Sequence, residues 1–486
     1  MNTGQHSQAS NGLLTCFGPS VGVHHGRLFI LLVLGLVCVR CFAAQNADND
    51  LPAFFDTTNL WSAELSLSQE QWQEFLKGKR TRRQNSSLTG DAETGRSYLY
   101  AHADLIVGGR MIRDVGVRLK GSGTQAGNGI NRWPFRIDLS QFGGRARLDG
   151  ARKISLNNNY YDSSYLRDAL SYEFFRKFNV PASRTCFIKL HLTVSGICQR
   201  KYLGLYTAVE AVESPFLMDH FHNVSGLLLK PDFGMSSFPT AQDWPSLSGL
   251  LHPKSEGSAQ QHQRVVDLFQ LANWNDLALF EEGLPKLIDV DEYLRFLVVN
   301  VVLVNQDSYL GMGKNYYVYL DPRCEQLNWL PWDLDLSMAG YFFCGTPEQR
   351  MDLSVDQPSS IADRLIRRVL GVPKFRERYH ELMREFLRSN FQRDRVFARI
   401  DELADIIREA VKEENSTSSA EFDHSIDGRS PSTDVASIEP KRRWMLIEPG
   451  LKLFVTKRIE SVEAQLAGKH RGARTGFGSV QPWDLK

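Results

Sequence analysis

The spacing of apolar residues along the first half of the chain is that of β-strands. Residues 61–68 alternate apolar and polar side chains, as a half-buried strand does. Two longer apolar segments, 98–107 and 111–120, flank a Gly-Gly pair and predict a hairpin. The same criteria predict further strands at 133–140, 153–158, 184–194 and 202–212.

Helical spacing appears between these strands and dominates after them. Ser68, with Gln71 three residues later, predicts a short helix through mutual capping. Residues 163–178 carry apolar side chains at helical spacing and end before Pro181. A strongly apolar helix is expected before Asp307, and a hairpin after it. Beyond Thr346 the pattern predicts helices at 361–371, 374–389, 393–414 and 451–468.

This change of pattern predicts an α+β fold with a helical C-terminal region. We expect an α+β core over 51–345, a helical C-terminal part of the same domain over 346–470, and a tail at 471–486. Residues 415–440 are rich in Ser and Asp and are expected to form a mobile insertion. The basic run 77–83 is expected to be a solvated loop, with a polyanion-binding patch as the alternative.

The first 44 residues resemble an export signal. Leu28 to Val39 is an apolar run behind Arg27, too short for the ~20 residues that span a bilayer. Small residues at Ala43 and Ala44 suit cleavage. We therefore expect an exported protein, secreted, periplasmic or in the cell envelope. An uncleaved N-terminal anchor is the alternative, and no other stretch reaches transmembrane length.

Composition and charge remove several classes of protein. Of 486 residues, 42% are hydrophobic and 23% charged, which is a globular composition. The formal net charge of +1 gives no support for nucleic acid as a main partner. Four cysteines follow the leader, and two disulfides, 186–198 and 324–344, are favoured by proximity; free buried thiols are the alternative.

The densest group of polar residues lies between 305 and 335. Asp307 ends the apolar helix, and Asn315 follows a loop with two glycines. Asp333 and Asp335 are two residues apart, so on a strand their carboxylates would face the same side. Close carboxylates raise each other's pKa unless a cation neutralises them, and Mg²⁺ suits oxygen ligands. The alternative is a capped helix followed by an Asp-containing turn.

Three further segments offer polar groups at element ends. Lys120 precedes the glycine-rich residues 121–124, which can present a cation and backbone N–H groups to a phosphate, or form a polar hairpin. Three asparagines at 157–159 suit caps and turns. Arg167 can bind an anion or pair with Asp162. Glu210 ends a strand, where a surface edge is the default expectation.

Taken in order, five segments resemble the CotH kinase family. They are residues 116–124, 153–185, 204–213, 298–322 and 327–336, and the resemblance extends over roughly 51–470. It implies an atypical protein-kinase-like, two-lobed fold. It also implies transfer of the ATP γ-phosphoryl group to Ser or Thr of a protein, with ATP and Mg²⁺ (or Mn²⁺) as cofactors.

The resemblance further implies a role for individual side chains. The expected roles are the following: Lys120 holds ATP phosphates, Asp307 is the base, Asn315 and Asp333 bind Mg²⁺, Asp335 is a second metal ligand, Glu210 borders the adenine at the connector between lobes, and Trp332 stacks on the base.

These expectations describe an exported kinase acting on an envelope, coat or secreted protein. Two alternatives stay open at this point. One is a noncatalytic surface or envelope-assembly protein that retains the fold for binding. The other is transfer of a different group, such as a nucleotidyl moiety, through the same metal and triphosphate contacts.

Overall fold

The computed structural model describes residues 50–84, 99–120, 132–231, 239–240, 243–359, 363–427 and 448–476. The expected leader and the glycine-rich residues 121–124 lie outside this described part. Leu51–Lys486 forms one folded unit, and all contacts below belong to it. In the described ranges, no helix combines the length and the apolar character needed to cross a membrane.

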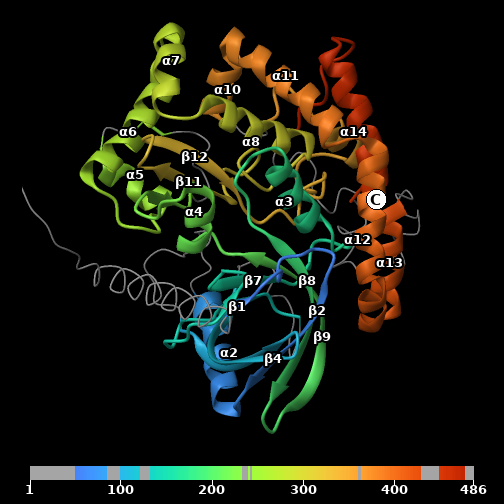
Figure 1. Ribbon diagram of the computed structural model, residues 1–486. Coiled ribbons are helices and arrows are strands. Elements are labelled where there is room, and N and C mark those ends of the chain that lie inside the picture. The colour runs from blue at the N-terminus through green and yellow to red at the C-terminus, as the bar shows by residue number, and fades with distance from the viewer. Residues whose placement is uncertain are drawn as a thin grey trace, which may run out of the picture. The chain divides into compact units, whose positions relative to one another are not determined.

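A closed β-barrel forms the first part of this unit (Figure 1). β2 and β8 pair in parallel and close it, whereas all its other neighbouring strands are antiparallel. The predicted strands are confirmed. In spatial order the barrel contains β2 (Leu60–Leu67), β3 (Ala101–Val107), β4 (Arg110–Leu119), β5 (Phe135–Asp138), β7 (Lys153–Asn157), β9 (Cys198–Glu210) and β8 (Thr185–Val194). The short strands β1 (Asp50–Leu51) and β6 (Arg147–Leu148) form a separate pair.

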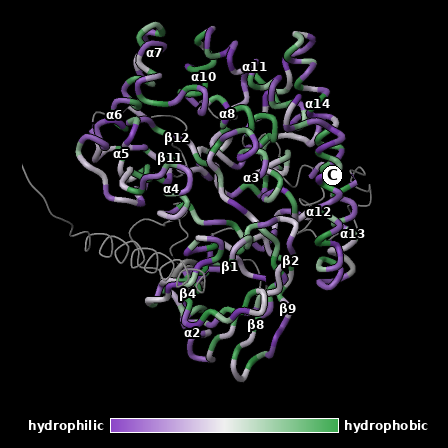
Figure 2. Tube along the Cα trace, in the orientation of Figure 1, coloured by the Kyte–Doolittle hydropathy of each residue, from purple (hydrophilic) through white to green (hydrophobic). Residues whose placement is uncertain are grey.

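Alternating side chains fill the barrel, and helix α2 (Gln69–Gln84) packs against it. Hydrophobic and hydrophilic residues follow one another along the barrel strands in Figure 2. The predicted helix start is confirmed, because the Ser68 hydroxyl accepts the Gln71 N–H at 3.1 Å. The loop expected at 77–83 is wrong: these residues continue α2, since Lys, Arg and Gln favour helix once it has started.

A second hydrophobic core lies beyond the barrel, around a three-stranded antiparallel sheet and α8 (Val290–Val302). The sheet consists of β10 (Leu227–Leu229), β11 (Tyr316–Asp321) and β12 (Gln326–Pro331), and the predicted β11–β12 hairpin is confirmed. Helix α3 (Arg167–Lys177) contacts both β8 and α8. The α+β class is thus correct, while the two-lobed kinase-like arrangement stays a prediction.

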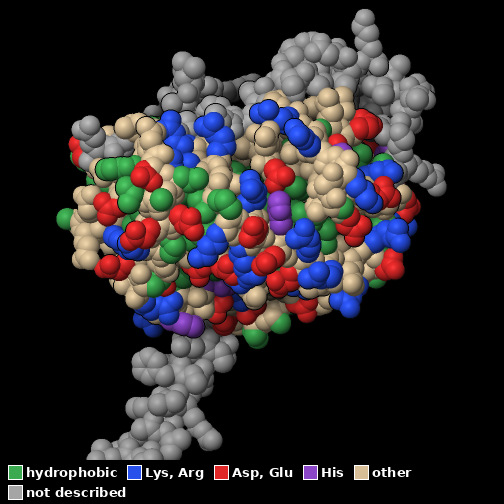
Figure 3. Space-filling view, turned by 90° about the horizontal axis from the view of Figure 1, so that it is seen from above, with side chains coloured by type: hydrophobic (Ala, Val, Ile, Leu, Met, Phe, Trp, Pro, Cys, Tyr) green, Lys and Arg blue, Asp and Glu red, His purple; other side chains and the backbone are tan. Residues whose placement is uncertain are grey.

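Charged side chains of both signs are interspersed on the face of the molecule seen in Figure 3.

The remaining helices surround the second hydrophobic core. The helices are α4 (Ser214–Phe221), α5 (Trp244–Leu251), α6 (Ala259–Asn273), α7 (Leu277–Gly283), the 3₁₀ turn η2 (Leu284–Lys286), α9 (Pro347–Met351), α10 (Arg364–Gly371), α11 (Pro373–Ser389), α12 (Arg393–Glu414), α13 (Ser416–Asp427) and α14 (Leu451–Leu466).

The segment expected to be a mobile insertion begins with an ordered helix. Ser416–Asp427 is α13, which packs on α12 and α14, and residues 428–440 lie outside the described part. Asn415 accepts the N–H of Ser418 at 2.8 Å, and Phe422 and Ile426 are buried one turn apart. The Ser- and Asp-rich composition did not predict this helix, because its apolar residues are few. They nevertheless have helical spacing.

The two expected disulfides are absent, since all four described cysteines are free. On the β8–β9 pair, Cys186 lies opposite Ala208 and Cys198 opposite Val194. Eight residues of strand, roughly 26 Å, therefore separate the two sulfurs that sequence proximity favoured. Burial raises the pKa of Cys186, as expected for an unreactive core thiol.

Asp363 provides a pH test of the second core. It is fully buried and caps α10 by accepting the Ile366 N–H at 2.7 Å. Burial raises its pKa to about 8, so the folded protein keeps a proton that the unfolded chain releases above about pH 4. Stability is therefore lost as pH rises between these values. Asp363→Asn retains the cap, and its free energy of unfolding relative to wild type should rise from pH 5 to 8 in urea titrations. A pH-independent difference would contradict this.

Candidate active site

Four segments that are distant in sequence meet at one charged centre. They are the end of β4, the start of α3, the loop after α8 and the loop after β12. Lys120 Nζ donates to Asp333 Oδ1 at 2.9 Å, across 213 positions of sequence. The cation and one of the carboxylates implied by the family resemblance are therefore in direct contact.

Asp307 and Asn315 form the neighbouring pair. Asn315 Nδ2 donates to the Asp307 carbonyl at 2.6 Å and to its Oδ2 at 3.2 Å, while Lys314 Nζ lies 3.1 Å from Oδ1. Burial raises the pKa of Asp307; Lys314 opposes this shift and Asp333 adds to it. Asp307 and Asp333 are therefore electrostatically coupled.

The loop with Asp307 is fixed by the end of α8. Asp289 begins this helix by accepting the Glu292 N–H at 3.0 Å. At its other end, Arg458 of α14 is fully buried and donates to the carbonyls of Val301 at 3.0 Å and Val302 at 3.3 Å. A cation at these carbonyls stabilises a helix C-terminus. Helix α14 thus helps to place the loop that carries Asp307.

Asp333 and Asp335 lie beyond the end of β12, so the expectation that both lie on a strand is wrong. β12 ends at Pro331, and Asp333 has a left-handed φ of 57°, as does Asn315. Non-glycine residues adopt this region seldom, and such positions cluster at functional sites. Burial raises the pKa of Asp335 well above the usual value, and the nearby charges of Asp333 and Asp168 add to this shift.

Asp168 is a central residue that the sequence analysis missed. It is fully buried in the first turn of α3, where it accepts Asn157 Nδ2 at 2.6 Å and the Leu334 N–H at 2.9 Å. Burial and then Asp333 raise its pKa to about 6. In sequence it resembles an ordinary acid at a helix N-terminus, and only its burial distinguishes it.

The three consecutive asparagines do more than form a turn. Asn157 accepts Lys120 Nζ at 2.6 Å, and Asn158 Nδ2 donates to the Arg132 carbonyl at 2.7 Å. Asn159 accepts the Thr207 hydroxyl at 3.0 Å. The three asparagines therefore hold Lys120 and Arg132, which are the described residues on either side of positions 121–131, and link them to β9.

A match to the family described as CotH kinase protein covers residues 117–433, which is well over half of the chain. The protein belongs to the CotH kinase family. Inner spore coat protein H of Bacillus subtilis (strain 168) is 27% identical over 248 residues. That alignment covers 50% of this chain and 64% of the Bacillus protein, so the chain spans less than two thirds of that relative.

Within this CotH family member, Trp332 is surrounded by cations. Its ring lies 5.3 Å from Lys120 Nζ, 5.9 Å from Lys230 Nζ and 6.0 Å from Arg136 Cζ, and it packs edge-on to Tyr317. Trp332 is only 3% exposed, so a base could stack on it only after the ring becomes accessible. Lys230 was not predicted from the sequence, because it follows a short apolar strand and belongs to no recognisable motif.

Glu210 is also placed differently from the expected surface edge. It is buried at the end of β9 and pairs with Arg184, Oε1 to Nη2 at 2.7 Å and Oε2 to Nε at 3.0 Å. This bidentate pair secures the strand where the chain leaves the barrel for α4. Contact of Glu210 with adenine stays a prediction.

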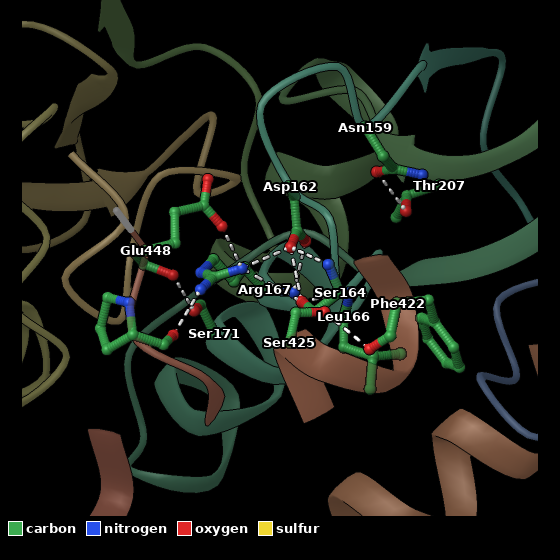
Figure 4. Close-up of polar contacts among 12 residues, drawn as sticks. Asn159, Asp162, Ser164, Leu166, Arg167, Ser171, Thr207, Phe422, Ser425 and Glu448 are labelled. Atoms are coloured by element: carbon green, nitrogen blue, oxygen red, sulfur yellow. Dashed lines mark hydrogen bonds and ion pairs between the residues drawn. The ribbon is translucent and has the colours of Figure 1, made fainter. Parts of the chain in front are cut away.

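Arg167 has a structural role, as one of its two sequence interpretations proposed. Figure 4 shows its buried guanidinium between two acids. Nη1 lies 2.7 Å from Asp162 Oδ1 and 2.9 Å from Glu448 Oε2, and Nη2 donates to the Pro449 carbonyl at 3.1 Å. Anion binding by Arg167 is therefore unnecessary to explain its position.

The oxygen atoms of the CotH site fit a hard divalent cation that also binds phosphate. Among the described residues, no three His, Cys, Asp or Glu side chains are grouped to hold a metal unaided. Asn315 uses its amide nitrogen in both contacts with Asp307, so its amide oxygen can face a cation. Burial raises the pKa of Asp335 most, and the charges of Asp333 and Asp168 add a repulsion that a cation would relieve. Mg²⁺ commonly combines one or two carboxylates with substrate phosphates.

Proposed function

We propose that this protein transfers the γ-phosphoryl group of ATP to a Ser or Thr hydroxyl of an envelope, coat or secreted protein. The observation that carries the proposal is the convergence of Lys120, Asp307, Asn315 and Asp333 on one partly buried centre. A protein that only binds a partner requires no such combination of base, cation and oxygen ligands. Phosphoryl transfer requires all of them.

The side chains divide the work as follows. Lys120 and Lys230 supply positive charge for the phosphates, and both hold the pKa of Asp333 below its usual value despite burial. Asn315 and Asp333, with Asp335 beside them, are the residues that would hold Mg²⁺ or Mn²⁺. When bound, such a cation neutralises charge that develops on the phosphate oxygens.

Asp307 is the proposed general base. The acceptor hydroxyl oxygen forms a bond to the γ-phosphorus, and the bond from that phosphorus to the β–γ bridging oxygen breaks. The hydroxyl proton passes to the Asp307 carboxylate, and ADP leaves. Burial raises the pKa of Asp307, which increases its basicity, while Lys314 at 3.1 Å favours its charged form.

The cellular location is proposed from two observations. The Bacillus relative carries the name inner spore coat protein H, and the apolar run at 28–39 has the size of an export signal. Together they support an envelope or coat protein as the acceptor.

Mass spectrometry of the purified chain with Mg·ATP and a generic acceptor protein tests the proposal. We expect a phosphoryl group on Ser or Thr of the chain or the acceptor. An added nucleotidyl group would show that the protein catalyses nucleotidyl transfer in place of the proposed reaction. No added mass, with ATP bound, would favour the noncatalytic binding protein.

Asp333→Asn is expected to abolish stabilisation by Mg·ATP. A ligand that binds only the folded state stabilises it by about 2.7 kcal/mol at a hundred times its Kd. The wild type should therefore show a higher melting temperature with Mg·ATP. Asp356→Asn, which alters an exposed acid paired with His380, is the matched control. An equal response of Asp333→Asn and wild type would remove Asp333 from the metal site.

A further inference from the structure

The side chain of Asp168 is connected to Lys120 through one intermediate. Asp168 Oδ2 accepts Asn157 Nδ2 at 2.6 Å, and Asn157 Oδ1 accepts Lys120 Nζ at 2.6 Å. These contacts join α3, β7 and the end of β4. Every distance in this chain of contacts is that of a strong hydrogen bond.

The other oxygen of Asp168 reaches the loop after β12. Oδ1 accepts the Leu334 N–H at 2.9 Å, and one turn further along α3 the Tyr172 hydroxyl accepts the Asp333 N–H at 3.0 Å. The contact between Lys120 and Asp333 at 2.9 Å closes the ring. Helix α3 therefore holds both ends of the ion pair at the centre of the site.

The chemistry of the amide explains why a carboxylate is needed. An asparagine side chain can present either its oxygen or its NH₂ group to a neighbour. An ionised Asp168 only accepts hydrogen bonds, so it requires the NH₂ group of Asn157 and turns the amide oxygen toward Lys120. Asp168 is fully buried, which prevents direct contact with a nucleotide.

We propose that Asp168 is a positioning residue for the phosphoryl-transfer site. Through Asn157 it directs the ammonium group of Lys120, and through the Leu334 N–H it holds the left-handed turn at Asp333. This role rests on the proposed kinase function. It adds one buried acid, without direct contact to the substrates, that sets the spacing between the phosphate-binding lysine and a metal ligand.

The first test is the reactivity of Lys120 in Asp168→Asn. Without the carboxylate, the Asn157 amide can turn and expose Lys120, so acetylation of Lys120 by acetic anhydride should be about tenfold faster. The rate is measured without nucleotide by peptide mass spectrometry, with the exposed Lys177 as an internal reference. Ser171→Ala is the matched control, because Ser171 links the same helix to Ser337 at 2.6 Å. It should leave the Lys120 rate unchanged.

Asn157→Ala and the double variant test the route. Asn157→Ala should raise Lys120 reactivity about as much as Asp168→Asn, and the double variant should add nothing further. Additive effects, or a Lys120 rate in Asp168→Asn equal to that of Ser171→Ala, would overturn the proposal. If Asp168→Asn does not fold, a wild-type rate of Lys120 acetylation in folded Asn157→Ala would also overturn the proposal.

Failure of the positioning role can be told apart from failure of the kinase proposal. If the wild type transfers no phosphoryl group, the acetylation rates still decide whether Asp168 directs Lys120. If the wild type is active, Asp168→Asn should raise the KM for ATP and lower kcat, whereas Ser171→Ala should change neither. An active wild type with unchanged Lys120 reactivity in Asp168→Asn would overturn the positioning role alone.

Discussion

Asp307→Asn should fold and bind Mg·ATP but transfer phosphoryl groups about 10² to 10⁴ times more slowly than the wild type. The asparagine has nearly the same shape and keeps one oxygen near Lys314 and Asn315. Its amide cannot take up the proton of the acceptor hydroxyl. Initial rates of acceptor phosphorylation measure the transfer step. Melting temperatures with and without Mg·ATP measure folding and nucleotide binding.

Asp363→Asn serves as the control for this substitution. It makes the same chemical change at another fully buried aspartate, and that residue caps α10 outside the charged centre. It should retain wild-type rates. Wild-type turnover by Asp307→Asn at unchanged stability would show that Asp307 only holds the loop after α8, and would favour the noncatalytic binding protein.

Arg167→Met should lower the free energy of unfolding by about 3 to 5 kcal/mol. The guanidinium is fully buried between Asp162 and Glu448, so its removal leaves buried acids without their cation. It also releases the Pro449 carbonyl. Urea denaturation followed by tryptophan fluorescence measures the change.

Arg378→Met is the comparison at an exposed ion pair. Arg378 contacts Asp291 at 2.6 Å, with both side chains 38% exposed, and such pairs contribute about 1 kcal/mol or less. A similar small loss in both variants would mean that burial of Arg167 does not govern its contribution.

The elements of the fold could be predicted because their apolar spacing is local. Strand alternation located the barrel strands, and α12 has the bounds that its helical period predicts. Closure of the barrel could not be predicted, since the parallel pairing of Leu60 with Phe187 joins strands that no turn connects. The basic run 77–83 was also predicted wrongly as a loop: it continues α2, because Lys, Arg and Gln favour a helix that has already started.

The site could be predicted only in part. The resemblance singled out Lys120 and Asp333, which lie in direct contact, because whole segments were matched in order; their roles stay predictions. Asp168 and Lys230 carry no recognisable spacing, and their importance depends on contacts across more than a hundred residues. The strand geometry assigned to Asp333 failed because a left-handed backbone leaves no periodic signal.

The buried contacts of the last helices have a consequence for synthesis of the chain. Glu414, at the end of α12, pairs with Arg132 at 2.6 Å and accepts the Leu205 N–H of β9 at 2.7 Å. Arg132 and Glu414 are 282 positions apart, as are Arg167 and Pro449. The barrel and α3 therefore cannot complete their contacts until residues 414 and 449 have left the ribosome. A nascent chain that stops before Glu414 would expose these groups to chaperones and proteases.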